Sequence, residues 1–454
     1  MNRTIAILVT AALITLLALL LGGVVPPPTT APVPSNAVTL GKVSLAATPS
    51  SQYVVAGGEM YLDISLAGLT GASKRKLPIN LALVIDRSGS MAGQKLEHAK
   101  EAARSVVGRL RDGDRIAIVT YGSDVTVLVA STLINSTSRS TVLSVIDGIV
   151  DRGGTFLSGG LQSGQDELQR HSREGFVNRM VLISDGQANE GVTSIGELSG
   201  MARRALEQGV HVTTMGVGLD FNENVMTAMA EHGGGHYYFI QDTASMAKIF
   251  SSELETLLST VARNAVLRMH LQPGVDLVEV FGYTHRREGS TVIIDLPDLY
   301  SGLSRKILCK LRLPDGADGT RAVAEVELAF VDVDSGAPRT VKAGATVALT
   351  ADRQKMVESE DRGVMARAEQ VTASKNLNEA MEAYGRGDVV RSQALLQAQI
   401  RQTERLNASL KSKTLDDTVV RLRRRLSATS AAPASPAGRS LVKEGKYEAY
   451  QLAK

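Results

Sequence analysis

The sequence predicts a doubly wound, mostly parallel α/β sheet inserted in an antiparallel β-sandwich, with an N-terminal transmembrane helix and a C-terminal helical segment. Residues 78–260 alternate apolar runs with amphipathic segments, as strands and helices do when helices cover both faces of a parallel sheet. Residues 38–77 and 261–350 alternate apolar and polar positions, which is typical of antiparallel strands with one solvated face. An uncharged apolar run near the N-terminus has the ~20 residues that a membrane-spanning helix needs.

The composition is that of a globular protein and excludes several functional classes. Of 454 residues, 43% are hydrophobic and 21% are charged, which excludes wholesale disorder and a protein with many membrane spans. The formal net charge of +3 is too small to steer the whole molecule onto nucleic acid, so we expect no nucleic-acid partner. The single cysteine, Cys309, excludes an internal disulfide framework and a thiolate metal cage. We expect Cys309 to be a buried, inert thiol, because it shares a strand face with Ile307 and Leu311.

The N-terminal segment determines the expected compartment. Residues 5–21 are uncharged and apolar, Arg3 precedes them, and the next basic residue is Lys42. The positive-inside rule therefore places the body of the protein outside the cytoplasm. Residues 1–25 are either a signal anchor in the cell membrane or a cleaved signal peptide, and both export the body, to the periplasm, the cell surface or the medium. Residues 26–37 are rich in proline and are expected to form a semi-rigid linker.

Local patterns predict the remaining elements. In the α/β domain we expect strands at 79–85, 115–121, 180–184, 210–217 and 237–240, and helices at 96–111, 137–149, 158–171, 194–208, 222–231 and 244–258. Residues 351–427 are expected to be helical, and residues 428–454 to be a disordered tail, since their first part is rich in Ala, Ser and Pro. The basic run 421–425 is interpreted as a solvated helix end, with contact to anionic lipid or another polyanion as the alternative.

Oxygen-bearing side chains follow the strands where ligands of open α/β sheets bind, at the carboxyl edge. Asp86, Ser88 and Ser90 come at alternate positions after the first strand, Thr155 follows two glycines, and Asp185 comes directly after the strand at 180–184. Two carboxylates and three hydroxyls are hard oxygen ligands, which favour Mg²⁺, with Mn²⁺ or Ca²⁺ as alternatives, over zinc. A site with so little negative charge would leave a coordination position for an external carboxylate.

These residues resemble the metal-ion-dependent adhesion site of the von Willebrand factor type A (VWA) domain family. The match consists of the Asp-x-Ser-x-Ser triplet at Asp86, Ser88 and Ser90, the glycine-flanked Thr155, and a Ser-Asp-Gly around Asp185, in the family's order. The resemblance covers roughly residues 78–260 and implies a Rossmann-like VWA sheet. It also implies that the triplet and the threonine bind the metal directly or through water, and that the last aspartate acts through a bridging water. Together with its flanks, the chain is similar to a group of exported bacterial proteins that contain this domain.

The expected function is binding, not catalysis. We predict an extracytoplasmic adhesion or scaffold module in the cell envelope, whose Mg²⁺ is completed by an Asp or Glu carboxylate of a partner protein. Two alternatives stay open. One is a metal-dependent hydrolase, for which Glu190 and His98 are the nearest candidate bases in the sequence. The other is a VWA partner of a ring ATPase in the cytoplasm, which the expected export opposes.

Three further motifs are interpreted as structural or as chance matches. The two histidines of 232–236 flank three glycines, which predicts a turn into a strand and not a metal site. The Ser-x-x-Lys at 245–248 has no accompanying Lys-Thr-Gly, so a penicillin-binding site is not expected. The Arg-Gly-Asp at 386–388 is expected to be a turn between two helices.

Overall fold

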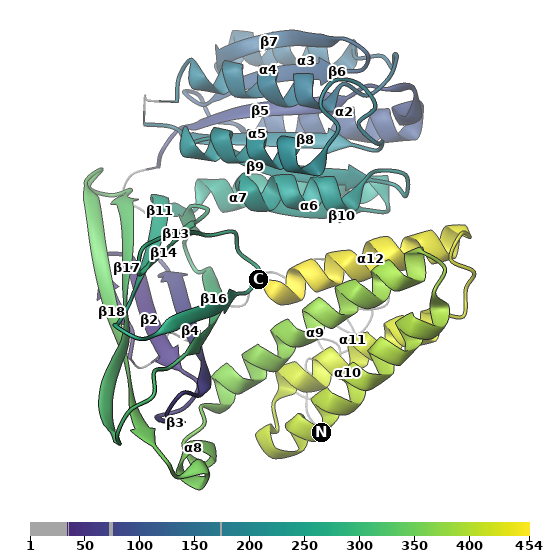
Figure 1. Cartoon of the computed structure of the whole chain (residues 1–454). Helices are drawn as coiled ribbons and strands as arrows, with labels where there is room; N and C mark the ends of the chain where they lie inside the picture. The colour runs from purple at the N-terminus through teal and green to yellow at the C-terminus, as the bar shows by residue number, and fades with distance from the viewer. Residues whose placement is uncertain (1–33, 35, 72–75, 173–174) are drawn as a thin grey trace, which may run out of the picture.

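The computed structural model describes residues 34, 36–71, 76–172 and 175–454, and it has three parts (Figure 1). An α/β domain lies above a β-sandwich and a bundle of helices, in the orientation of the figure. The membrane segment expected at residues 1–25 lies outside the described residues, as does most of the linker expected at 26–37. In the part of the chain that the structure describes, no helix has the length and apolar character that crossing a bilayer requires.

The α/β domain is built on a six-stranded sheet with β5 near its centre. The strand order is β10 (Gly234–Ile240), β9 (His211–Val217), β8 (Val177–Ser184), β5 (Ile79–Asp86), β6 (Arg115–Tyr121) and β7 (Val125–Leu133). All neighbours are parallel except β7, which runs antiparallel to β6. Every residue of β5 is buried, as expected for a continuous apolar run between two parallel neighbours. Strand β7, a partly exposed edge strand, was not predicted, although Val125, Val127 and Val129 stand at alternate positions in it.

Helices cover both faces of this sheet, as the alternating pattern predicts. Helices α2 (Gln94–Arg109), α3 (Ser136–Asp147) and α7 (Met246–Leu258) share one core with the strands, and α4 (Leu157–Gln169), α5 (Ile195–Glu207) and α6 (Glu223–His232) share the other. The stripe on α2 at Leu96, Ala99, Ala103 and Val106 is buried, since residues three and four apart lie on one helix face. Two short 3₁₀ turns, η1 (Gly89–Met91) and η2 (Thr243–Ser245), precede α2 and α7.

The β-sandwich contains strands from both sides of the α/β domain. One sheet has the order β1 (Val38–Leu40), β2 (Val43–Pro49), β4 (Glu59–Gly68), β16 (Ser304–Arg312) and β12 (Asp276–Val280). The other has the order β13 (Arg286–Glu288), β14 (Thr291–Asp295), β11 (Thr260–Leu271), β17 (Gly319–Asp332), β18 (Pro338–Thr350) and β3 (Tyr53–Val55), with β15 (Leu299–Tyr300) beside β11. Because β16 pairs along its whole length with β4, the α/β domain is an insertion between β4 and β11.

The two sheets of the sandwich enclose one apolar core that includes Cys309. The thiol is fully buried, and burial raises the pKa of Cys309 to about 12. This agrees with the inert thiol expected from the strand pattern, because the thiolate is the reactive form.

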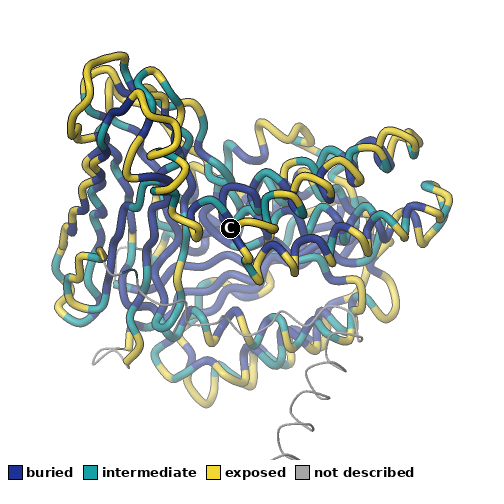
Figure 2. Tube along the Cα trace, turned by 90° about the horizontal axis from the view of Figure 1, so that it is seen from below, coloured by how far each residue is buried: buried dark blue, intermediate teal, exposed yellow. Residues whose placement is uncertain are grey.

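In the C-terminal region, the short helix α8 (Arg353–Glu358) lies against β3 and β18 of the sandwich. It is followed by a helical bundle of α9 (Arg362–Gly385), α10 (Val389–Leu410), α11 (Lys413–Ala428) and α12 (Pro436–Ala453). The turn between α9 and α10 contains Arg386, Gly387 and Asp388, as predicted, and Asp388 caps α10 by accepting a hydrogen bond from the Arg391 N–H. Buried residues line the inner sides of these helices, and exposed residues lie mainly at their outer sides and in the loops (Figure 2).

The disordered tail expected at residues 428–454 is not observed, because most of this segment forms helix α12. Ser435 caps the helix and Pro436 takes its first position, where a missing N–H costs nothing. Leu441, Ala449 and Leu452 enter the core of the bundle. The Ala, Ser and Pro that suggested disorder belong mainly to the connection before the helix and to its first turn.

The basic run at 421–425 is a solvated helix end only in part, since Arg423 and Arg424 are exposed but Arg425 is buried. It lies within α11, where Arg425 donates to Glu444 at 2.6 Å and to Glu448 at 2.7 Å, both on α12. Arg424 is 3.3 Å from Glu448 as well. Ion pairs between part of this run and the acidic side chains of α12 thus join α11 to α12.

Candidate metal centre

The five predicted ligands lie together at the carboxyl edge of the parallel sheet. Asp86 ends β5, Asp185 directly follows the neighbouring strand β8, and Thr155 precedes α4. The Ser90 hydroxyl donates to Asp185 Oδ1 at 2.7 Å and lies 3.1 Å from the Ser88 hydroxyl. Gly186 lies beside both the Thr155 and Ser90 hydroxyls, since a Cβ atom at this position would be 3.4 Å from Thr155 Oγ1 and 3.5 Å from Ser90 Oγ. Residues that are about a hundred positions apart in the chain therefore converge on one point.

Asp86 and Asp185 are both completely buried, and Asp86 is held by two hydrogen bonds. Asp86 Oδ1 accepts from the Ser88 N–H at 2.8 Å, and Oδ2 accepts from the Ser184 hydroxyl at 2.7 Å. Burial raises the pKa of Asp86 to about 6, although these hydrogen bonds act in the opposite direction. A buried carboxylate of this kind is stabilised by a nearby cation, because the cation compensates for the water that burial removes.

Backbone contacts hold the threonine loop against the Asp86 loop. The Gly89 N–H donates to the Gly153 carbonyl at 3.1 Å, and Gly153 has a φ of +78°, a conformation that favours glycine. The Thr155 N–H donates to Asn189 Oδ1 at 2.9 Å, which ties the same loop to the segment after Asp185. Since Thr155 is buried and Ser90 is exposed, the site opens on the side of Ser90.

Lys95 is a member of the site that the sequence analysis missed. Its ammonium group contacts Asp185 Oδ2 and donates to the Ser90 carbonyl at 3.2 Å. Lys95 is the second residue of α2, so the first turn of the helix brings its side chain back over the loop that begins at Asp86. The sequence feature that could have identified Lys95 is its position, five residues after Ser90, the last serine of the triplet.

The donor set fits a hard divalent cation. It consists of two carboxylates and three hydroxyls, all of them oxygen donors, and Asp86, Ser88, Thr155 and Asp185 are buried. Within the described residues, no group of three His, Cys, Asp or Glu side chains is placed to hold a metal. A thiolate or imidazole site is therefore not present there, whereas hydroxyls and two carboxylates remain compatible with Mg²⁺ or Mn²⁺.

The two candidate general bases are engaged elsewhere. Glu190 lies at the rim of the site, where it accepts a hydrogen bond from the Ser123 hydroxyl at 2.7 Å. His98 Nδ1 lies 2.5 Å from the Thr243 hydroxyl, next to α7. Neither side chain has a contact with the five predicted ligands among the described hydrogen bonds.

The other motifs behave as structural elements. His236 lies 3.2 Å from Glu253, and His232 bonds the carbonyl of Ala228 within its own helix, so the two histidines do not share a site. They flank the end of α6 and the start of β10, in agreement with the predicted turn into a strand. The Ser245 hydroxyl donates to the Asp242 carbonyl at 2.7 Å, which makes it part of a turn.

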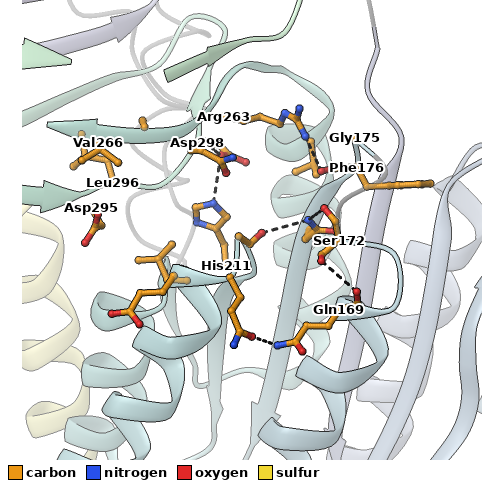
Figure 3. A pocket seen from close by; sticks show the side chains of 18 residues that line it. Gln169, Ser172, Gly175, Phe176, His211, Arg263, Val266, Asp295, Leu296 and Asp298 are labelled. Carbon is orange, nitrogen blue, oxygen red and sulfur yellow. Dashed lines mark hydrogen bonds and ion pairs between the residues drawn. The ribbon is translucent and has the colours of Figure 1, made fainter. Parts of the chain in front are cut away.

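A cavity of about 960 Å³ lies at the opposite, amino edge of the sheet, against the sandwich (Figure 3). His211 Nε2 lies 3.3 Å from Asp298 there, and Arg263 donates to the Phe176 carbonyl at 2.9 Å. The polar side chains drawn in Figure 3 point mainly at one another and not at a common point in the cavity. Among the residues described at this edge, the walls are polar but do not form a convergent donor set comparable with that at the carboxyl edge.

Comparison with known proteins agrees with the fold. Residues 80–252 match the family model of the von Willebrand factor type A domain. The chain is 26% identical over 308 residues to an uncharacterised protein of Synechocystis, covering 65% of this chain and 72% of that protein. It is 30% identical over 211 residues to the uncharacterised protein YfbK of Escherichia coli, covering 46% of this chain but 36% of YfbK. Against mouse inter-alpha-trypsin inhibitor heavy chain H2 the identity is 26% over 194 residues, and the match spans a fifth of that protein's length.

Two solved structures extend the similarity beyond the α/β domain. A von Willebrand factor type A protein from Catenulispora acidiphila superposes with a TM-score of 0.68 at 18% identity, covering 84% of this chain and 89% of that one. The ArnB paralog VWA2 from Sulfolobus acidocaldarius superposes with a TM-score of 0.60 at 18% identity, covering 89% and 99%. The architecture of the chain, and not only its α/β domain, is thus found in other proteins.

Proposed function

Residues 80–252 form a von Willebrand factor type A domain, and from this premise we propose that the chain is a metal-dependent protein-binding module. In this proposal Asp86, Ser88, Ser90, Thr155 and Asp185 hold Mg²⁺, and an Asp or Glu carboxylate of a partner protein completes the site. Domains of this family commonly mediate protein–protein interaction. The observation that carries the proposal is the convergence of the five oxygen donors, with Asp86 buried and Ser90 exposed at the mouth.

The charge of the site favours an acidic partner. Asp86 and Asp185 supply two negative charges and Lys95 supplies one positive charge, so the site has a net charge of about −1 before a dication is added. A bound dication supplies an electrophilic position that an anionic oxygen can occupy. Since the positive charge then exceeds the negative charge of the side chains, a carboxylate is a better ligand for this position than a neutral group.

We propose binding and not hydrolysis because neither candidate base is aimed at the site within the part of the chain that the structure describes. Glu190 and His98 are each hydrogen-bonded away from the five ligands. If the hydrolase alternative holds, the full chain will cleave generic phosphate or carboxylic ester substrates in Mg²⁺, and Asp185→Ala will abolish this cleavage.

The proposed compartment is the outside of the cell membrane. Its support is the apolar run at residues 5–21 after Arg3, together with the absence of further basic residues before Lys42. A reporter fused after Asn36 distinguishes the two topologies. Activity of an export-dependent reporter supports the proposal, and activity of a cytoplasmic reporter would favour the alternative, a partner of a ring ATPase.

The central experiment is a pull-down with the full chain from detergent-solubilised membranes. We expect a partner protein to be recovered in Mg²⁺, and to be lost both in chelator and with Asp86→Asn. Asp147→Asn is a matched control, because this aspartate is exposed on α3 and pairs with Arg104 away from the site. Recovery of the same partner in chelator, or by Asp86→Asn as efficiently as by the unchanged chain, contradicts a metal-dependent contact.

A further inference from the structure

Lys95 places a positive charge inside the proposed metal site. Its ammonium group contacts Asp185 Oδ2, whose side chain is fully buried, while the lysine side chain is 29% exposed. The same ammonium donates to the Ser90 carbonyl at 3.2 Å. Lys95 is therefore held by the backbone of one predicted ligand and by the carboxylate of another.

The path of the lysine side chain crosses the mouth of the site. A methyl group built at Gly218, the residue after β9, would lie 3.5 Å from Lys95 Cε and 3.6 Å from Nζ. The side chain thus extends from the first turn of α2, past the end of β8, toward the end of β9. Gly218 has a φ of +75°, a backbone conformation that favours glycine.

An ammonium group and a dication that use the same carboxylate compete for it. Both are attracted to Asp185, and they repel each other at the short separation that a shared carboxylate imposes. With both present, the two aspartates give −2, the lysine +1 and the dication +2, so the filled site has an excess charge of +1. An incoming carboxylate removes this excess and provides a second acceptor for the ammonium group.

We propose that Lys95 is a tethered competitor of the metal, which weakens divalent-cation binding in the absence of a partner and so couples metal binding to the arrival of a carboxylate. This inference rests on the proposed function, since it needs the five oxygen donors to hold a metal. The role of Lys95 is regulatory: it sets the affinity of the site for the metal, and it makes the acidic partner and the metal bind cooperatively.

The inference is tested by calorimetric titration of the full chain with Mg²⁺ alone, at low ionic strength. Lys95→Met keeps the length of the side chain and removes its charge, and we expect it to tighten Mg²⁺ binding about tenfold. We expect Lys95→Arg, which keeps the charge, to bind Mg²⁺ about as weakly as the unchanged chain. Lys100→Met is the matched control, because Lys100 lies on the same helix but pairs with Glu97, and we expect no change.

A second measurement covers the case in which Lys95→Met folds poorly. We expect Lys95→Gln to show a lower melting temperature than the unchanged chain without metal, since Asp185 loses its cation, and a larger rise in melting temperature when Mg²⁺ is added. Equal or weaker Mg²⁺ binding in both neutral variants overturns the inference. A lack of Mg²⁺ binding in the unchanged chain and in every variant overturns the proposed function itself, so the two failures are distinguishable.

Discussion

The guanidinium group of Arg179 donates to the Tyr300 hydroxyl at 2.6 Å, which joins the α/β domain to the sandwich through a buried charge. Arg179 lies on β8 and is completely buried, and Tyr300 lies on β15. The same guanidinium is 3.8 Å from Glu253 on α7. Although burial acts to lower the pKa of Arg179, Tyr300 and Glu253 raise it overall, so the charge is retained at this junction.

Tyr300→Phe is expected to destabilise the protein by about 1–3 kcal/mol, because it leaves a buried guanidinium without one of its acceptors. The measurement is urea denaturation of the unchanged chain and the variant. Tyr53→Phe is the control, since Tyr53 is 37% exposed. Equal loss of stability in both variants would show that the Arg179 contact has no special role.

Cys309 is expected to be unreactive toward thiol reagents in the folded protein at neutral pH. Its thiol is fully buried in the sandwich, and burial raises the pKa of Cys309 to about 12, so both access and the thiolate are missing. Reaction with Ellman's reagent, followed by absorbance with and without denaturant, checks this. Labelling of the folded protein as fast as that of the denatured protein contradicts the burial of the thiol.

The docking of α12 on the α/β domain is expected to weaken in acid. Lys443 of α12 lies 2.5 Å from Glu223 Oε2, and Lys446 lies 3.0 Å from Glu223 Oε1. Burial alone would raise the pKa of Glu223, but the two ammonium groups lower it to about 2. A carboxyl group with a lowered pKa stabilises the fold above its ordinary pKa of 4.5, and this contribution is lost as the pH falls from about 4.5 toward about 2.

Thermal unfolding across this pH range measures the effect. We expect the unchanged chain to lose stability more steeply than Glu223→Gln, which lacks the titrating group. At neutral pH we expect Glu223→Gln to be less stable by on the order of 2 kcal/mol, because Lys443 is then buried without its carboxylate. Glu207→Gln is the control, as Glu207 is exposed on α5. Parallel pH profiles for all three proteins would exclude Glu223 as the acid-sensitive group.

The candidate site could be predicted from the sequence because the sheet topology determines which strand ends lie side by side. The ends of adjacent parallel strands meet at one edge, so Asp86 and Asp185 are brought together once β5 and β8 are recognised. Asp86, Ser88, Ser90 and Asp185 then follow from positions at or just after the ends of those strands, whereas Thr155 lies in the loop before α4. The position of Lys95 depends on the direction that the first turn of α2 takes after η1, which the strand pattern does not contain.

One part that the sequence analysis missed, helix α12, is decided by tertiary contacts. Helix α12 has a first turn and a preceding connection rich in Ala, Ser and Pro, yet Tyr447 and Tyr450 pack edge-on against Tyr237 of β10 at 5.6 and 5.7 Å between ring centroids. The Tyr237 N–H also donates to the Tyr450 hydroxyl at 3.2 Å. These contacts stabilise a helix whose own composition is weak evidence for one. Strand β7 was missed although its sequence favours a strand, since β-branched Val125, Val127 and Val129 stand at alternate positions.

Thr155→Val is expected to weaken Mg²⁺ binding at least tenfold, whereas Thr155→Ser is expected to retain it. Valine has nearly the shape of threonine but no hydroxyl, and the Thr155 hydroxyl is one of the five proposed ligands. The backbone of the loop should keep its place, since the hydrogen bond from the Thr155 N–H to Asn189 does not involve the Thr155 side chain.

Thr120→Val is a matched control: Thr120 is buried on β6, and its hydroxyl has no hydrogen-bond partner among the described residues. Calorimetric titration with Mg²⁺ compares the three variants with the unchanged chain. Equal weakening by Thr155→Val and Thr120→Val would attribute the effect to general packing of the sheet, and unchanged binding in Thr155→Val would remove this hydroxyl from the ligand set.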